Sequence, residues 1–232
     1  MTRRLPPPHR AALGYLSDLG FRELYRDRIT PSAGEAPAAA GDVGSRAARL
    51  EALAVEAAAC QECELAGGRQ TVVFGSGDSN AELMFIGEGP GANEDRQGLP
   101  FVGPAGELLT RIIQAIDRTR DEVYIANIVK CRPPGNRDPR PEEVTACRGF
   151  LEAQIRLVAP AVIVALGRVA AQVLLGTDSP LGRMRGEWYS VQGVDTMVTY
   201  HPAALLRNVA LKRPVWEDMQ QVRDRLREGG ER

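Results

Sequence analysis

Four short apolar runs, separated by helical patterns, constrain the fold of this chain more than any other feature. They cover residues 82–87, 123–129, 161–167 and 196–200. Strands that are buried on both faces carry mainly apolar side chains at successive positions, because neither face meets water. We therefore expect four parallel strands in the interior of one sheet.

Helical patterns fill the intervals around these runs. They are expected at 46–59, from Pro104, from Pro141, at 168–175 and at 203–227 with an interruption near Pro214. Alternating strands and helices predict an α/β fold, here three-layer α/β/α with a central four-stranded, mainly parallel sheet. Ligands of such sheets bind beyond the carboxyl ends of the strands, so we expect the site in the loops at those ends.

The first 45 residues have a different character from the rest of the chain. Residues 11–29 have the leucine spacing of a short helix, and residues 30–45 are rich in Ala, Pro and Gly without periodicity. Such a composition is typical of a flexible linker. We predict an N-terminal helical appendage at 1–45 and one main domain at 46–232.

Charge and hydropathy limit the class of protein. The chain has 29 Lys and Arg against 30 Asp and Glu, a net charge of −1. This balance is only a weak argument against DNA binding, because a local basic patch is enough. No run approaches the roughly 18 apolar residues of a membrane span, and no apolar stretch follows the charged N-terminus as in a signal peptide. We expect a cytoplasmic protein that does not contact a membrane.

Four cysteines suggest a metal site, because cytoplasmic cysteines are more often metal ligands than disulfides. Cys60 and Cys63 form a C-x2-C pair, and Cys131 and Cys147 follow with fifteen residues between them. Four thiolates suit tetrahedral zinc or a [4Fe–4S] cluster. A second tight pair would favour a zinc ribbon, so the wide split gives modest favour to iron–sulfur. One or two of the cysteines could instead be ordinary core residues.

Three loops that follow the predicted strands should converge. They read GEGPGANEDRQGLPFVG, KCRPPGNRDPRP and YHPAALLRN. The glycines at 87–91 could cradle an anion, although the loop lacks the Lys-Ser/Thr of a Walker motif. Phe101, in a loop rich in Gly and Pro, is a candidate stacking surface for a planar ring or, alternatively, a plug on the core.

Together these motifs resemble the family 4 uracil-DNA glycosylases, the iron–sulfur branch of the uracil-DNA glycosylase superfamily. The matching segments are GEGPGANED at 87–95, LPFVGPAG at 99–106, NIVKCRPPGNR at 127–137 and HPAALLRN at 201–208. The four cysteines fall in the family's positions, which implies a [4Fe–4S] cluster. The acidic pair Glu94 and Asp95 favours family 4 over family 5, which lacks an acidic residue there.

The resemblance implies a DNA-repair enzyme that hydrolyses the N-glycosidic bond of uracil and leaves an abasic site. The base must leave the duplex to reach a pocket. Asn127 can accept from uracil N3–H and donate to O4, unless it only caps a turn. Phe101 would stack on the base, with Glu88 and Gly89 lining the pocket.

His201 would stabilise negative charge that develops on uracil O2. The sequence is compatible with either protonation state of this ring. Glu94 is the first choice for the carboxylate that orients water or stabilises the sugar cation, and Glu88 is the second.

Further residues are expected to contact DNA, either single- or double-stranded. Leu205 would fill the gap left by the flipped base, and four cationic side chains would contact phosphates: Lys130, Arg132, Arg137 and Arg207. Each of the arginines could also be an ordinary surface charge. We expect a monomer, and the sequence assigns no partner to residues 1–45.

Two other functions are compatible with the same residues. One is a non-catalytic or covalently trapping uracil-DNA-binding protein of the same superfamily. The covalent relative carries a basic, His-containing insertion after the second strand, which this chain lacks; its histidines are His9 and His201. The other is a zinc-stabilised nucleotide-binding module, which the colour and metal content of the purified protein would distinguish.

Overall fold

A computed structural model describes residues 45–230. The predicted appendage therefore lies outside the described residues, apart from Ser45. The longer helices are α2 Arg46–Ala59, α4 Pro104–Gln114, α5 Pro141–Val158, α6 Arg168–Leu175 and α9 Lys212–Gly230. Shorter ones are α3 Ala92–Gln97, α7 Leu181–Met184, α8 Pro202–Arg207 and the 3-10 turns Glu64–Gly67, Arg120–Glu122, Pro134–Asn136 and Val209–Leu211.

The sheet has six strands in the order β1-β3-β2-β4-β6-β5. Their bounds are β1 Ser76–Gly77, β2 Leu83–Gly87, β3 Tyr124–Asn127, β4 Val162–Leu166, β5 Trp188–Val191 and β6 Val194–Thr199. The four central strands are mutually parallel, and the two edge strands are antiparallel to their neighbours. The register pairs Gly87 with Asn127, so the carboxyl ends of β2 and β3 lie side by side.

The predicted four-stranded parallel core is confirmed, and the two edge strands were missed. β1 has only two residues, and β5 is partly exposed along most of its length, so neither has a continuous apolar run. β5 joins β6 through Gln192 and Gly193, which both have positive φ as in a tight hairpin turn. A sequence pattern that depends on burial on both faces cannot detect such strands.

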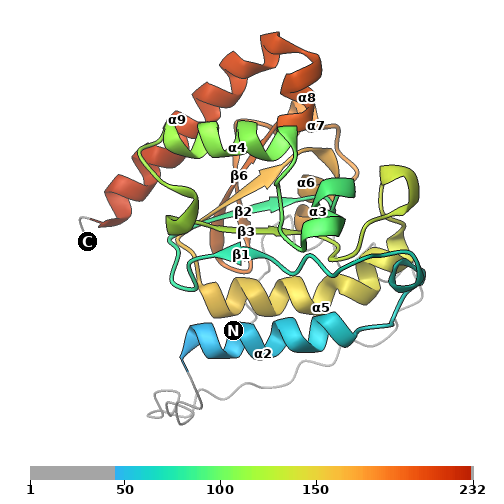
Figure 1. Cartoon of the computed structure of the whole chain (residues 1–232). Helices are drawn as coiled ribbons and strands as arrows, with labels where there is room; N and C mark the ends of the chain where they lie inside the picture. Colours follow the sequence, from blue (N-terminus) through green and yellow to red (C-terminus); the bar gives the residue numbers. More distant parts are fainter. Residues whose placement is uncertain (1–44, 231–232) are drawn as a thin grey trace, which may run out of the picture. The chain divides into compact units, whose positions relative to one another are not determined.

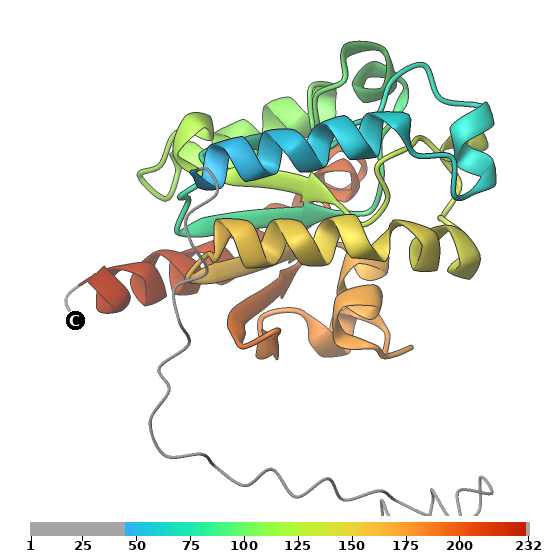
Figure 2. The same cartoon turned by 90° about the horizontal axis from the view of Figure 1, so that it is seen from below.

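Helices cover both faces of the sheet and make three layers (Figure 1). On one face, α5, α6 and α7 cover side chains such as Met84 and Ile163, with α2 packed along α5 (Figure 2). On the other face, α4, α8 and α9 cover Leu83 and Val164. Neighbouring residues of one strand thus enter opposite cores, as the period of two requires. No helix within residues 45–230 is both long and apolar enough to span a membrane.

The prediction that the last helical segment is interrupted near Pro214 is wrong, because the interruption lies at Asn208. The Asn208 side chain accepts a hydrogen bond from the Ala210 N–H at 3.1 Å, which caps the turn that follows. Pro214 is the third residue of α9, where its missing N–H has no helical partner to lose.

Candidate active site

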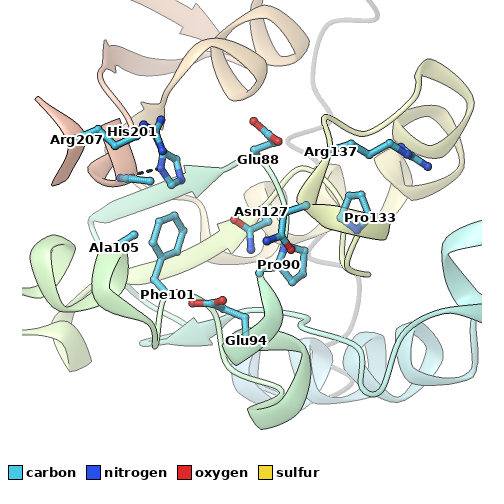
Figure 3. Close-up of a pocket in the computed structure, with 14 residues that line it drawn as sticks. Glu88, Pro90, Glu94, Phe101, Ala105, Asn127, Pro133, Arg137, His201 and Arg207 are labelled. Carbon is cyan, nitrogen blue, oxygen red and sulfur yellow. Dashed lines mark hydrogen bonds between the residues drawn. The ribbon is translucent and has the colours of Figure 1, made fainter. Parts of the chain in front are cut away.

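The carboxyl ends of the central strands meet at one pocket of about 420 Å³. β2 ends at Gly87, β3 ends at Asn127, and β6 leads into His201. Figure 3 shows Asn127 between Phe101 and His201 on one side and Pro133 on the other. The lining residues are Glu88, Gly89, Pro90, Gly91, Glu94, Phe101, Ala105, Asn127, Pro133, Asn136, Arg137, His201, Ala203 and Arg207.

Asn127 is the buried polar group of this pocket. Its side chain is 1% exposed, and its Oδ1 atom accepts no hydrogen bond from any described residue. A buried acceptor without a partner costs about 1–3 kcal/mol, so a ligand that donates a hydrogen bond here would remove that cost. Gly87 makes room for this group: a Cβ atom there would lie 2.5 Å from Oδ1 and 2.6 Å from the Phe101 ring.

Phe101 forms an aromatic wall. Its ring centroid lies 5.5 Å from that of His201, with the planes tilted by 30°. The side chain is buried against the core below α4 and α8, yet it also lines the pocket. The two interpretations of Phe101, a stacking surface and a plug on the core, are therefore compatible.

His201 is neutral at neutral pH. Burial lowers its pKa to about 4, aided by the positive charge of Arg207 and opposed by Glu94. Its Nδ1 atom accepts a hydrogen bond from the Ala203 N–H at 3.1 Å. The neutral ring must therefore carry its hydrogen on Nε2, which makes that nitrogen a donor.

Glu94 is fixed by the backbone on the opposite side of the pocket. Its Oε1 atom accepts hydrogen bonds from the N–H groups of Val102 and Gly103, both at 3.0 Å. Its Oε2 atom lies near Gly91, where an added Cβ would approach to 2.7 Å. One oxygen is thus occupied in holding a loop, and the other has no partner among residues 45–230.

Glu88 titrates near neutral pH. Burial and, to a smaller extent, the negative charge of Asp138 raise its pKa to about 7, against the opposing effect of Arg168. Unlike Glu94, this side chain accepts no hydrogen bond from a described backbone N–H.

Of the four cationic residues predicted to contact phosphates, the three arginines reach the surface and Lys130 is buried. Arg207 is exposed at the pocket, and Arg137 lines it while donating to both carboxylate oxygens of Glu143 at 2.8 and 2.6 Å. Arg132 lies outside the lining and donates from Nε to Asn136 Oδ1 at 2.8 Å. All three are at least partly exposed.

Two predicted DNA contacts are wrong because their side chains are buried. Lys130 is 1% exposed, and its ammonium donates to the Asn127 carbonyl at 2.8 Å and to Gln154 Oε1 at 2.5 Å. Leu205 is 2% exposed and belongs to the core cluster that also contains residues of α4 and α9. Leu206, one position later on α8, is 50% exposed.

The four cysteines line a second, separate cavity, together with Arg69. Arg69 donates to Cys131 Sγ at 3.4 Å, and the backbone N–H of Lys130 donates to Cys147 Sγ at 3.3 Å. Burial raises the pKa of the Cys147 thiol to about 11, so a bound cation is what would hold it as a thiolate.

The case for a metal centre at the cysteines rests on their chemistry and on the cavity that they share. Within residues 45–230, no three His, Cys, Asp or Glu side chains form a group that could hold a metal ion. The four soft sulfur donors nevertheless line one cavity, and such donors suit zinc or an iron–sulfur cluster.

Several residues that line the pocket were not predicted from the sequence. Four of them belong to the recognised motifs but have no polar side chain that would mark them as candidates for a site: Pro90, Gly91, Ala105 and Ala203. The exposure of Leu206 depends on the phase of a helix of only six residues, which its sequence does not define.

Comparison with known proteins gives a consistent result. The model of the Uracil DNA glycosylase superfamily matches residues 74–220. A type-4 uracil-DNA glycosylase of Saccharolobus solfataricus is 44% identical over 186 residues, which cover 76% of this chain and 86% of the relative. One of Sulfurisphaera tokodaii is 43% identical over 75% of this chain and 84% of the relative. A type-5 uracil-DNA glycosylase of Pyrobaculum aerophilum is 34% identical over 63% and 71%.

Proposed function

Because this chain belongs to the uracil DNA glycosylase superfamily, on its type-4 branch, we propose that it removes uracil from DNA and leaves an abasic site. The reaction is hydrolysis of the N-glycosidic bond, the first step of base excision repair. The relatives give no support to the alternative of a non-catalytic or covalent uracil-DNA-binding protein. The single observation that carries the proposal from the chain itself is the unpartnered Asn127 Oδ1 at the pocket.

Asn127 reads the base. Its Oδ1 accepts from uracil N3–H, and its amide N–H donates to uracil O4. Cytosine has an acceptor at N3 and a donor at the exocyclic amine, so it would place like groups together. Such a mismatch leaves buried polar groups unpaired at a cost of about 1–3 kcal/mol each.

Phe101 and His201 act on the ring once it is bound. The Phe101 ring stacks on the face of the extruded base, a contact worth about 1–3 kcal/mol. His201, neutral and with its hydrogen on Nε2, donates to uracil O2, where negative charge develops as the glycosidic bond breaks. A preorganised donor at such an oxygen is worth about 10²–10³ in rate.

Glu94 acts on the sugar side of the bond. Its Oε1 atom is occupied by two backbone donors, which leaves Oε2 to orient the attacking water or stabilise the oxocarbenium-like sugar. Because His201 stabilises the leaving anion, one carboxylate is sufficient. Glu88, whose pKa is about 7, is assigned to the pocket lining rather than to the chemistry.

The surface around the pocket binds the DNA strand. Arg207, Arg137 and Arg132 lie near the mouth with exposed surface and contact phosphates, which position the strand without reading its sequence. Leu206 replaces Leu205 as the wedge that fills the gap left by the extruded base, because it is the exposed leucine of α8.

The cysteine cavity holds a [4Fe–4S] cluster. Its ligands are Cys60, Cys63, Cys131 and Cys147, and its contribution is structural: it fixes the loop after β3 to the end of α2. No step of the reaction requires it. We further propose that the protein acts as a monomer in the cytoplasm, on single- or double-stranded DNA.

A uracil-release assay tests the function. The purified protein is incubated with oligonucleotides that carry uracil, cytosine or thymine at one position, in single- and double-stranded form. We expect free uracil from the first alone and an abasic site that breaks only after alkali. A covalent adduct on a denaturing gel, or no release at all, would overturn the proposal. A colourless protein that contains zinc and no iron would overturn the cluster assignment.

A further inference from the structure

Phe101 has a backbone conformation that bulky residues rarely adopt. Its φ angle is +53°, in the left-handed region. Such a conformation in a non-glycine residue costs about 1–3 kcal/mol and persists only where the surrounding structure enforces it. The loop around Phe101 must therefore contain contacts that hold it.

These contacts lie on both sides of Phe101. On the C-terminal side, Glu94 Oε1 accepts from the N–H groups of Val102 and Gly103. On the N-terminal side, Arg120 donates from Nη2 to the carbonyl of Pro100. The three backbone groups that flank Phe101 are thus bonded to side chains from elsewhere in the chain.

Close packing leaves the residue little room to relax. A Cβ atom at Gly106 would lie 1.8 Å from the Phe101 carbonyl oxygen, which shows how closely the first turn of α4 approaches this backbone. The ring is equally confined, because Gly87 lies directly against it. A change in the Phe101 φ angle would therefore move the ring out of its place beside His201.

Arg120 is well suited to hold the loop from a distance. It lies in the 3-10 turn Arg120–Glu122, immediately before the strand that ends in Asn127. Besides Pro100, it reaches Thr110 Oγ1 on α4 with Nη1 at 3.5 Å. One planar guanidinium thus connects the loop before Phe101 to the helix after it.

We propose that Arg120 is a positioning residue for base binding, which acts by holding Phe101 in its left-handed conformation as the stacking surface. This proposal rests on the proposed function, because it names what the held ring is for. Arg120 itself touches neither the base nor the sugar. Its removal should weaken ground-state binding of uracil more than it slows bond cleavage.

The first experiment compares Arg120→Gln with the wild-type protein. We expect KM for a uracil oligonucleotide and Ki for free uracil to rise together by about tenfold, with a smaller change in kcat, because a displaced ring loses stacking. Arg118→Gln is the matched control: Arg118 lies two residues away and pairs with exposed Glu82 at 3.0 Å, far from the loop. It should leave both constants unchanged.

The second experiment tests whether Arg120 acts through Phe101. In a Phe101→Ala background, which lacks the ring, Arg120→Gln should have almost no additional effect on KM or Ki. Full additivity of the two substitutions, or an unchanged KM in folded Arg120→Gln, would overturn the proposal. Arg120→Lys, which keeps one donor for Pro100, should recover part of the loss.

Folding and function are separated by two further readouts. If thermal melting shows that Arg120→Gln is unfolded, Arg120→Met, which keeps an extended side chain but has no donor for Pro100, takes its place, and an unchanged KM and Ki in that variant then overturn the proposal. If the wild-type protein binds free uracil but releases none from DNA, the proposed function fails and the effect of Arg120 on uracil affinity still decides its role.

Discussion

The pocket at the strand ends and the cysteine cavity differ in how their polar groups are satisfied. In the pocket, Asn127 Oδ1 and Glu94 Oε2 have no partner among the described residues. In the cysteine cavity, Cys131 and Cys147 each accept a hydrogen bond from the surrounding chain. The first suits the proposed base, which arrives and leaves during each turnover, and the second the proposed cluster, which remains bound.

The two regions are connected by the segment from Asn127 to Cys131. Lys130 contacts both regions. Its ammonium donates to the Asn127 carbonyl, and its backbone N–H donates to Cys147 Sγ. Because Lys130 is bonded to both regions, substitutions at Lys130 should affect both, whereas substitutions elsewhere in one region should leave the other intact. The following predictions test that separation, from the largest expected effect to the smallest.

Replacing Asn127 by Ala should abolish base reading without disturbing the cysteine cavity. We expect kcat/KM for uracil release to fall by at least about 10³, because the variant loses both hydrogen bonds that select the base. The visible absorbance of the cluster and the melting temperature should stay near the wild-type values. An activity close to wild type would show that another residue reads the base.

Replacing Cys131 by Ser should give the opposite pattern. The visible absorbance should be lost and the melting temperature should fall by about 10 °C, as expected for a loss of roughly 3–4 kcal/mol in a domain of this size. Activity should fall in proportion to the unfolded fraction at the assay temperature. A variant with full stability and full activity would disprove the structural role of the cluster.

Replacing Lys130 by Met should affect both regions moderately. The apolar side chain fills the space but leaves the Asn127 carbonyl and Gln154 Oε1 without their donor, at a cost of about 1–3 kcal/mol. We expect a melting temperature several degrees lower, about 2–4 °C per kcal/mol, and kcat/KM reduced about tenfold.

Lys212→Met serves as the control for stability, since Lys212 is the other lysine of the chain and is exposed. If Lys130→Met lowered stability but left kcat/KM unchanged, the hydrogen bonds of Lys130 would not connect the cysteine cavity to the activity of the pocket, and only packing would join the two regions.

Replacing Glu88 by Gln should change stability only above about pH 4.5. The pKa of Glu88 is raised from 4.5 to about 7, so the folded state favours the protonated form. That contribution is complete below pH 4.5 and is lost as the pH rises through 7. We expect the variant to melt above the wild-type protein at pH 8, with the difference vanishing near pH 4.5. If the melting temperatures of the variant and the wild-type protein differed by the same amount at every pH in this range, Glu88 would not be the group whose titration changes the stability.

Much of the fold and of the pocket could be predicted because it depends on local patterns. The central strands follow from their apolar runs, and α4 and α5 begin at the prolines that the sequence predicts. The convergence of Asn127 and His201 follows from the geometry of parallel strands, whose carboxyl ends share one edge.

The failures concern properties that depend on distant partners. Lys130 was predicted to contact DNA. This prediction failed because the sequence does not reveal that Gln154, on α5, provides a buried acceptor for the ammonium group. The sequence gives no signal of the role proposed for Arg120, since its partner Pro100 lies twenty residues earlier in the chain. Leu205 and Leu206 are chemically equal, and only the packing of α8 distinguishes them.

The pairing of Gly87 with Asn127 makes the proposed recognition of the base depend on how two strands align. A shift of β3 by one residue would turn Asn127 to the opposite face of the sheet and present a neighbouring apolar side chain instead. A molecule that folded with this shift would retain most of its core and remain unable to recognise uracil. Catalytic activity per molecule is therefore a direct measure of correct strand alignment, more sensitive than any spectrum of secondary structure.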